Sequence, residues 1–532
     1  MSILRRLRRL ARGQDGFTML NVMFTMMALG TFSVSAWALA TGDIPLARAD
    51  QDHKRAYEAA QAGLQWYAYE LDRDPTYWTK CASVLPIAPG VPAPVNLEGA
   101  NPRVWRTLPG SNARYTIEIM KKRDANGNPT TACSTSDAVG TTLQNNTLRI
   151  RSTAQANGET RSIIATFKRR SFIDFVYFTS SEAQDPLVGG GTDAQCSAQR
   201  SAARDNACTE ITFINPDTVN GPLHTNDRSV LTTGTPITFG RLGKNDAFEV
   251  NGASPGYTGS TPTFRGPTKF FAGQMDPPPG NGALKTLATP AWTYTGSTCL
   301  VFKPDATVDV YPNRDWTAGR VTCSGGAVNR PLTGPSGPPN GVIYVQNDPA
   351  VGCGTNYSKY QLYKNPKSCG DVAVSGSYAA SVTVGAENDI IANGDVLQQA
   401  GSDSMLGLVA TGFVRIYHPI QNETANSCGN NVMPAGVARV TEVDAAILSL
   451  AHSFMVDNYH CGGSEGTLTV KGAIAQWYRG VVGTGNGTTG YIKNYNYDDR
   501  LKVREPPNFL DPIKTSWRIV RQTEQKPPST GP

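Results

Sequence analysis

A stretch of 25 residues without a charged side chain, Phe17–Thr41, limits this chain more than any other feature of its sequence. As a helix it would be roughly 37 Å long, which is enough to cross the ~30 Å hydrocarbon core of a membrane. Five arginines precede the stretch, and Asp43 follows it. Because positive charge stays on the cytoplasmic side, we expect one span in the cytoplasmic membrane with the remainder of the chain outside.

The residues at the start of this stretch resemble a processing site. Gln14–Leu20, with the sequence QDGFTML, is similar to the prepilin peptidase site of type IV pilins and pseudopilins, where a glycine precedes a start of the Phe-Thr-Leu type. The resemblance implies cleavage between Gly16 and Phe17, N-methylation of Phe17, and retention of the apolar helix for assembly. Two alternatives are a secretory signal peptide cut near Ala38–Ala40 and an uncleaved anchor.

The fifth residue after the expected cleavage departs from the family pattern. Most type IV pilins carry a glutamate there, which is thought to meet the N-terminal amine of a neighbouring subunit, whereas this chain has Asn21. Asparagine forms hydrogen bonds but cannot neutralise an amine. Tip pseudopilins of the family also lack the glutamate, so the resemblance implies a tip or initiating subunit. The alternatives are a minor pilin whose asparagine only forms hydrogen bonds within the helix bundle, and a chain that never joins a fibre.

A second helical pattern follows the apolar stretch. We expect Pro45 to kink the helix, and the helix to resume after Gly42–Pro45. Apolar residues between Arg48 and Asp72 recur at spacings of three or four and predict one buried face: Ala56, Ala60, Leu64, Tyr67 and Leu71. Tyr57–Gly63 resembles the stretch after the span in minor pilins of the PilX N-terminal type.

The residues beyond this helix predict a small antiparallel sheet. Arg114–Met120 alternates in polarity as a strand does. Leu148–Ala156 and Ile163–Phe167 also alternate, and they flank Asn157-Gly158, a pair typical of type I′ hairpin turns. One long helix on a small antiparallel sheet is the architecture of a pilin head, so the family resemblance covers residues 17–170.

Short apolar pairs separated by Gly, Asn or Asp characterise the residues from 171 onwards. They include Val382/Val384, Ile390/Ile391, Leu406/Val409, Val414/Ile416, Ile447/Leu448, Leu468/Val470 and Ala473/Ile474. Short strands between frequent turns are typical of a right-handed parallel β-helix, whereas the alternative, a β-sandwich, has longer strands with cleaner alternation. Residues 261–339 do not fit regular coils, and we expect them to form lateral loops.

The predicted fold class is therefore α+β, with a long N-terminal helix on a small antiparallel sheet followed by a large, mainly β domain. The expected organisation is a leader peptide at 1–16, a transmembrane and assembly helix at 17–41, a pilin-like head at 42–170, a β-rich domain at 171–522 and a polar, disordered tail at 523–532.

All ten cysteines lie beyond the apolar stretch. An even number confined to the exported side predicts disulfides. Zinc is the competing interpretation, but it prefers pairs with C-x₂₋₄-C spacing and none occurs here. Free thiols are the remaining alternative. Pairing neighbours, which crosses the fewest loops, gives Cys81–Cys133, Cys196–Cys208, Cys299–Cys323, Cys353–Cys369 and Cys428–Cys461.

No sequence pattern predicts catalysis, a cofactor or a metal site. The five histidines lie outside ligand spacings, and no G-x-S-x-G elbow occurs. Residues 1–16 carry a net charge of +4, so their removal lowers the formal charge from +6 to +2, which gives no case for nucleic-acid binding. A membrane-anchored, polysaccharide-acting β-helix enzyme is an alternative that would require Asp389 and Asp395 to share one strand face.

These features predict a non-enzymatic minor subunit, at the tip or initiating assembly, of a type IV pilus-like filament. Its expected partners are other pilin-like subunits, the prepilin peptidase and the assembly platform. We expect it in the cytoplasmic (inner) membrane before assembly and in a cell-surface filament afterwards, with the β domain available for surface contact or adhesion. A pseudopilin of a secretion machine is the second alternative.

Overall fold

The computed structural model divides into two compact units, and the second unit interrupts the sequence of the first. The described residues are 17–74, 77–79, 81–82, 95–99, 103–120, 147–197, 207–316, 320–354, 365–421, 428, 433–513 and 517–526. The first unit consists of Met1–Gly140, Leu148–Phe167 and Ile519–Pro532, and the second of Thr141–Thr147 and Lys168–Arg518. The sequence predicted one domain after the other, whereas the structure has an insertion.

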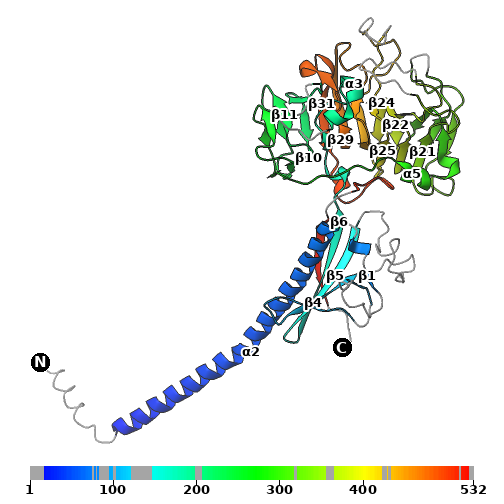
Figure 1. Cartoon of the computed structure of the whole chain (residues 1–532). Helices are drawn as coiled ribbons and strands as arrows, with labels where there is room; N and C mark the ends of the chain where they lie inside the picture. Colours follow the sequence, from blue (N-terminus) through cyan, green and yellow to red (C-terminus); the bar gives the residue numbers. More distant parts are fainter. Residues whose placement is uncertain are drawn as a thin grey trace. The chain divides into compact units, whose positions relative to one another are not determined.

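The first unit begins with α2 (Phe17–Arg73), a single helix of 57 residues (Figure 1). The expected interruption at Gly42–Pro45 is wrong, because these residues belong to the helix. Proline removes one backbone hydrogen bond, and many intact turns on both sides keep the backbone helical.

A seven-stranded sheet completes the first unit. Its strands are β1 (Cys81–Ala82), β2 (Val95–Leu97), β3 (Arg106–Thr107), β4 (Arg114–Ile119), β5 (Thr147–Ala156), β6 (Glu159–Arg169) and β32 (Trp517–Gln525), and η1 (Tyr77–Thr79) is a short 3-10 helix. The order is β1-β2-β4-β5-β6-β32, and β3 pairs with β4. The sheet is mixed rather than antiparallel, since β2 pairs in parallel with both β1 and β4.

Two predictions about this sheet are confirmed, and a third differs from the structure at its first three residues. The predicted strand at Arg114–Met120 is β4, and the predicted hairpin is β5–β6. Asn157 (φ 48°) and Gly158 (φ 91°) both have the left-handed backbone that a type I′ turn requires. Of the tail predicted at 523–532, residues 523–525 instead belong to β32, the strand beside β6, and residues 527–532 lie outside the described residues. Strand pairing of residues 523–525 overrides their polar composition.

The C-terminal half of α2 contacts this sheet. The five residues of the predicted apolar face are completely buried: Ala56, Ala60, Leu64, Tyr67 and Leu71. The Trp66 ring lies 6.4 Å from that of Tyr115, and the Tyr67 ring lies 5.7 Å from that of Phe167. The helix and sheet lie in close contact at Gly63, where an added Cβ would lie 2.8 Å from a carbon of the Tyr115 ring. The face that the spacing predicted is therefore confirmed as buried.

The second unit consists mostly of strands. They are β7 (Tyr177–Ser181), β8 (Thr212–Ile214), β9 (Thr218–Asn220), β10 (Leu223–Thr225), β11 (Val230–Thr233), β12 (Thr238–Phe239), β13 (Phe248–Val250), β14 (Tyr257–Gly259), β15 (Thr263–Phe264), β16 (Thr268–Lys269), β17 (Thr293–Thr295), β18 (Thr298–Phe302), β19 (Thr307–Tyr311), β20 (Val328–Pro331), β21 (Val342–Gln346), β22 (Val372–Tyr378), β23 (Val382–Ala386), β24 (Ile390–Gln398), β25 (Leu406–Ala410), β26 (Val414–Ile416), β27 (Glu442–Ser449), β28 (Phe454–Val456), β29 (Ser464–Tyr478), β30 (Gly483–Thr484) and β31 (Thr489–Tyr497). The short helices are η3 (Phe172–Asp174), α3 (Pro186–Gly189), α4 (Asp193–Cys196), α5 (Gly282–Leu287), η4 (Pro290–Trp292), η5 (Gly485–Gly487) and η6 (Asp499–Lys502).

Twenty-two of these strands form one sheet, and β14-β11-β8 form another. Many strands pair in parallel with the strand two positions further along the chain. One such series is β21-β23-β25-β27-β29, and a second is β22-β24-β26-β28. All seven predicted apolar pairs lie in these strands.

Part of the segment 261–339, predicted to form lateral loops, belongs to the same sheet. β17 pairs in parallel with β21, and β18 pairs in parallel with β22. The loop prediction is therefore wrong for these strands. Their short apolar runs give a weak sequence signal, and pairing with longer strands determines their conformation.

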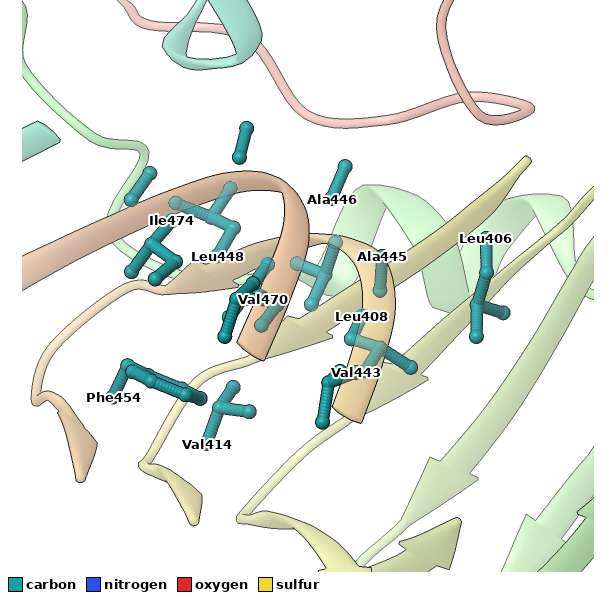
Figure 2. Close-up of a cluster of buried hydrophobic side chains, with 14 of the residues drawn as sticks. Leu406, Leu408, Val414, Val443, Ala445, Ala446, Leu448, Phe454, Val470 and Ile474 are labelled. Atoms are coloured by element: carbon teal, nitrogen blue, oxygen red, sulfur yellow. The ribbon is translucent and has the colours of Figure 1, made fainter. Parts of the chain in front are cut away.

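The core of the second unit is built from side chains stacked in register. Val384 pairs with Leu408, Leu408 with Ile447, Ile447 with Ile474, and Ile474 with Tyr177. All five are at most 2% exposed. Figure 2 shows Leu408 and Ile474 within this cluster of buried side chains. Removal of such apolar surface from water is the main stabilising contribution to a fold of this kind.

Candidate functional site

The N-terminal half of α2 is apolar and uncovered. Met19–Trp37 is the segment, among the helices of the described residues, that is long and apolar enough to cross a membrane, and none of it is buried. Met19 is 81% exposed, Phe32 is 74% exposed and Trp37 is 72% exposed. A continuous apolar surface of this extent is stable only when lipid or other apolar side chains cover it.

Two hydroxyl groups of this segment form hydrogen bonds within the helix, and one amide is exposed on its surface. Thr25 donates to the carbonyl oxygen of Asn21 at 2.8 Å, and Thr31 donates to that of Ala28 at 2.9 Å. Both hydroxyls therefore pair within their own helix. The Asn21 side chain is exposed on the apolar surface. In an apolar environment, such an amide is a strong candidate for a hydrogen bond to a neighbouring helix.

The structure describes the other predicted processing and assembly residues only in part. Gly16 lies outside the described residues. The backbone of Phe17 begins α2, but the side chains of Phe17 and Pro45 are outside the description. Cleavage after Gly16 and methylation of Phe17 stay predictions.

The second unit contains four disulfides, which are four of the five neighbour pairs predicted. They are Cys196–Cys208, Cys299–Cys323, Cys353–Cys369 and Cys428–Cys461. The fifth predicted pair, Cys81–Cys133, falls outside the described residues, because Cys133 is not among them. Each described disulfide closes a loop of 12 to 33 residues, so the bonds brace individual loops rather than distant parts of the chain.

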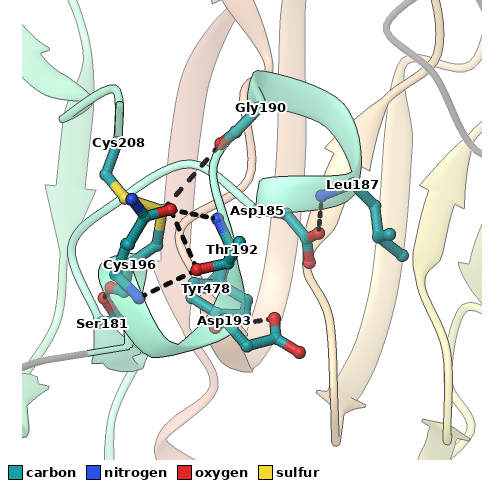
Figure 3. The surroundings of a disulfide bond; sticks show 10 residues. Ser181, Asp185, Leu187, Gly190, Thr192, Asp193, Cys196, Cys208 and Tyr478 are labelled. Atoms are coloured by element: carbon teal, nitrogen blue, oxygen red, sulfur yellow. Dashed lines mark hydrogen bonds between the residues drawn. A yellow bond between two sulfur atoms is a disulfide. The ribbon is translucent and has the colours of Figure 1, made fainter. Parts of the chain in front are cut away.

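Figure 3 shows how the loop around Cys196–Cys208 is organised. Thr192 caps α4, since its hydroxyl accepts from the backbone N–H of Gln195 at 3.4 Å, and its own backbone N–H donates to the Gln195 side chain at 2.9 Å. The Asp185 carboxylate accepts from the backbone N–H of Leu187 at 2.9 Å and so caps α3. The Tyr478 hydroxyl donates to Asp193 at 3.1 Å and connects α4 with the end of β29.

Asp185 also contacts a histidine 267 residues away in the sequence. Nδ1 of His452 lies 2.9 Å from the Asp185 carboxylate, and the His452 ring stacks on Phe413. Burial disfavours the charged imidazole, but the hydrogen bond and the negative charge of Asp185 outweigh it and raise the pKa of His452. This pair was not predictable from the sequence, because nothing local connects the two positions.

The carboxylates required for the polysaccharide-acting alternative have separate partners. Asp389 is fully buried, and its ion pair with Arg415 has an N···O distance of 3.0 Å. Asp395 is half-buried and accepts from the backbone N–H of Thr441 at 2.6 Å. A carboxylate neutralised by a buried arginine is a structural ion pair rather than an available acid or base.

One cluster has the ligand types of a metal site. Cys428, His460 and Cys461 place one sulfur or nitrogen atom each within 4.8 Å of the others. Both cysteines belong to one disulfide, however, and a metal requires thiolates. In this oxidised state, the cluster offers a single imidazole.

Comparison with known proteins leaves the class open. No family model matches the chain, and no curated protein matches it. Among solved structures, the chain is similar to the competence-associated pilin ComZ from Thermus thermophilus, with 12% identity over 89% of this chain and 97% of that chain, at a TM-score of 0.26. Agreement this low says nothing about fold or function, so the function has to be inferred from the chain's own residues.

Proposed function

We propose that this chain is a minor subunit of a type IV pilus-like filament and has no enzymatic activity. One observation carries the proposal: a single helix has an apolar, uncovered half at Met19–Trp37 and a second half whose apolar face is buried within its own unit. The first half of such a helix anchors the subunit in a membrane and can later pack among similar helices. The expected partners are other pilin-like subunits, the prepilin peptidase and the assembly platform.

Asn21 supports a position at the tip or at the start of assembly. Its exposed amide forms hydrogen bonds but carries no charge, so it offers no counter-ion to the terminal amine of another subunit. A subunit that needs no neighbour above it has no use for that counter-ion.

For the second unit, we propose a right-handed parallel β-helix. The parallel pairing of each strand with the strand two positions later supports it, because coils of a solenoid stack in this way. A β-sandwich is built from antiparallel neighbours, and these series are parallel. The disulfide-braced loops on this framework would be presented outside the cell for surface contact or adhesion.

The test is the N-terminus of the mature protein, determined by mass spectrometry. We expect a chain that begins at methylated Phe17. Gly16→Val should accumulate the full-length precursor, whereas Gly13→Val, a matched glycine in the same leader, should mature normally. A mature chain that begins near Thr41, or normal maturation of Gly16→Val, would contradict the proposal.

A pseudopilin of a secretion machine would show the same processing, and location separates the two functions. Gold-labelled antibody at the ends of surface filaments would support the pilus subunit. Label confined to the cell envelope would favour the secretion machine.

A further inference from the structure

Four neighbouring parallel strands present two rows of polar side chains. Across β27, β29, β31 and β9, the register aligns Glu442, Thr469, Asn494 and Thr218 in one row and Asp444, Lys471, Asn496 and Asn220 in the other. We call these eight residues the polar array. The residues between the two rows point inwards and are at most 3% exposed: Val443, Val470, Tyr495 and Val219. The array thus lies on the outer face of the sheet.

The spacing within the array is regular. Neighbouring strands lie ~4.8 Å apart, and residues two apart along a strand lie ~6.6 Å apart. Hydrogen bonds hold several of the side chains in place. Thr218 donates to Asn494 at 2.9 Å, Asn494 donates to Thr469 at 3.2 Å, and Asn220 donates to Asn496 at 2.9 Å. The array is therefore organised before any ligand arrives, which lowers the entropic cost of binding.

The array has both donors and acceptors to offer a ligand. A threonine hydroxyl or an asparagine amide has more hydrogen-bonding positions than these internal contacts use. Lys471, whose side chain is 54% exposed, is an additional donor and forms an ion pair with Glu442. A ligand that fits such a surface must itself both donate and accept.

The charges of the array disfavour a polyanion. Two carboxylates, Glu442 and Asp444, flank the single ammonium of Lys471, whose nitrogen lies 4.0 Å from Asp444 Oδ1. Burial raises the pKa of Asp444 to about 6, so this carboxylate approaches neutrality in mildly acidic surroundings. Nucleic acids and acidic polymers need an excess of positive charge, which is absent from the array.

Three residues from one row of the array line a pocket of about 630 Å³. Asp444, Lys471 and Asn496 line it together with residues 398–402, at and after the end of β24, and residues 498–501, at the start of η6. Apolar groups of Ala400, Met405 and Leu406 contribute to the same wall. A volume of this size is typical of sites for small ligands, and mixed polar and apolar walls suit a ring that has hydroxyl groups at its edge and C–H groups on its face.

We propose that the polar array and its adjoining pocket bind an uncharged glycan chain. Hydroxyl groups along such a chain both donate and accept, as the array requires. This inference rests on the proposed surface-contact function. It adds the chemical class of the surface that the second unit would contact.

The test uses the full-length protein in detergent on immobilised cellulose, xylan, galactomannan and dextran, with heparin as the polyanionic comparison. We expect retention on at least one of the four uncharged polysaccharides and not on heparin alone. Calorimetry with a hexasaccharide of the polysaccharide that retains the protein then gives a dissociation constant.

Two matched variants locate the site. Asn496→Ala should weaken binding of that hexasaccharide about fivefold, because one or two hydrogen bonds are lost. The control is Asn329→Ala in β20, which removes an exposed asparagine that bridges Thr307 and Asp309 in a hairpin outside the array, and it should leave binding unchanged. If Asn496→Ala does not fold, as judged by its melting temperature, Lys471→Gln replaces it, since that side chain is largely exposed.

The outcomes separate this inference from the proposed function. Failure of all four uncharged polysaccharides to retain the protein, retention by heparin only, or equal binding by Asn496→Ala and the wild type would each overturn the glycan site. Glycan binding by a chain that never matures at Phe17 would instead overturn the filament role and leave the glycan site standing.

Discussion

The first half of α2 and the interior of the second unit have similar apolar side chains in opposite surroundings. Leu29 in the helix is 66% exposed, whereas Ile474 in β29 is fully buried. In the second unit, the in-register strands of the same chain cover each apolar residue. In the helix, nothing among the described residues does so, and the covering has to come from a membrane or from other helices.

The comparison shows that composition does not distinguish a folding core from an assembly surface. A strand buries its side chains against strands that the same chain supplies. An isolated helix satisfies its own backbone and can leave its whole surface apolar, which is the requirement for a helix in lipid.

The largest expected effect is on the stability of the second unit, where strands of the same chain cover the apolar side chains. Ile474→Ala removes buried methylene groups from a stacked row and should lower the free energy of unfolding of the second unit by about 2–5 kcal/mol. Thermal unfolding followed by tryptophan fluorescence measures the change.

Leu29→Ala is the matched control in the uncovered region and should leave that unfolding transition unchanged. Leu29→Arg should instead release the chain from the membrane fraction, because a charge at the centre of a span costs about 2.5–3.5 kcal/mol. An unfolding transition that responds to Leu29→Ala as strongly as to Ile474→Ala would contradict the distinction.

The next effect concerns the bonds that brace the covered region. Replacement of Cys299 and Cys323 by serine opens a loop closed over a separation of 24 residues, and should destabilise the second unit by about 3 kcal/mol. Thermal unfolding with and without reductant measures it: the reductant should lower the melting temperature of the wild type more than that of the double variant. Equal sensitivity would show that this bond contributes little.

A smaller effect is expected from alanine substitutions at two glycines of α2, one in contact with the sheet and one in the uncovered half. Gly63→Ala places a Cβ 2.8 Å from the Tyr115 ring and should destabilise the first unit by about 1–3 kcal/mol. Gly30→Ala meets nothing within 4 Å and should be neutral or slightly stabilising, since alanine favours a helix. Protease sensitivity of the first unit measures both, and equal effects would contradict the proposed difference in surroundings.

The smallest expected effect is a pH dependence of stability that arises from the contact between His452 and Asp185 in the second unit. The pKa of His452 is raised by Asp185, so the pair stabilises the fold fully below the ordinary histidine pKa of about 6.5 and loses this contribution as the pH rises through the higher folded-state value. His452→Gln should flatten the melting temperature between pH 6 and 8, and Asp185→Asn should do the same. An unchanged pH profile in both variants would contradict the assignment.

Much of the local structure was predictable from the sequence. The hairpin at Asn157-Gly158, the buried face that includes Leu64, and the neighbouring disulfides such as Cys196–Cys208 all depend on residues close together in the chain. The continuity of α2 through Pro45 was not predicted, because the loss of one hydrogen bond weighs little within a long helix. Nor was the mixed sheet of the first unit, because pairing direction has no local signal.

The position of the apolar helix, the buried face of its later residues and the cysteines near enough to pair all follow from the amino-acid sequence. Three other features became evident only in the folded chain: the insertion of the second unit before β32, the contact of Asp185 with His452, and the polar array. The two groups differ in the sequence distance over which their interactions act. Helix periodicity and turn chemistry act over a few residues, whereas the array depends on strand register between residues up to 276 positions apart, such as Thr218 and Asn494.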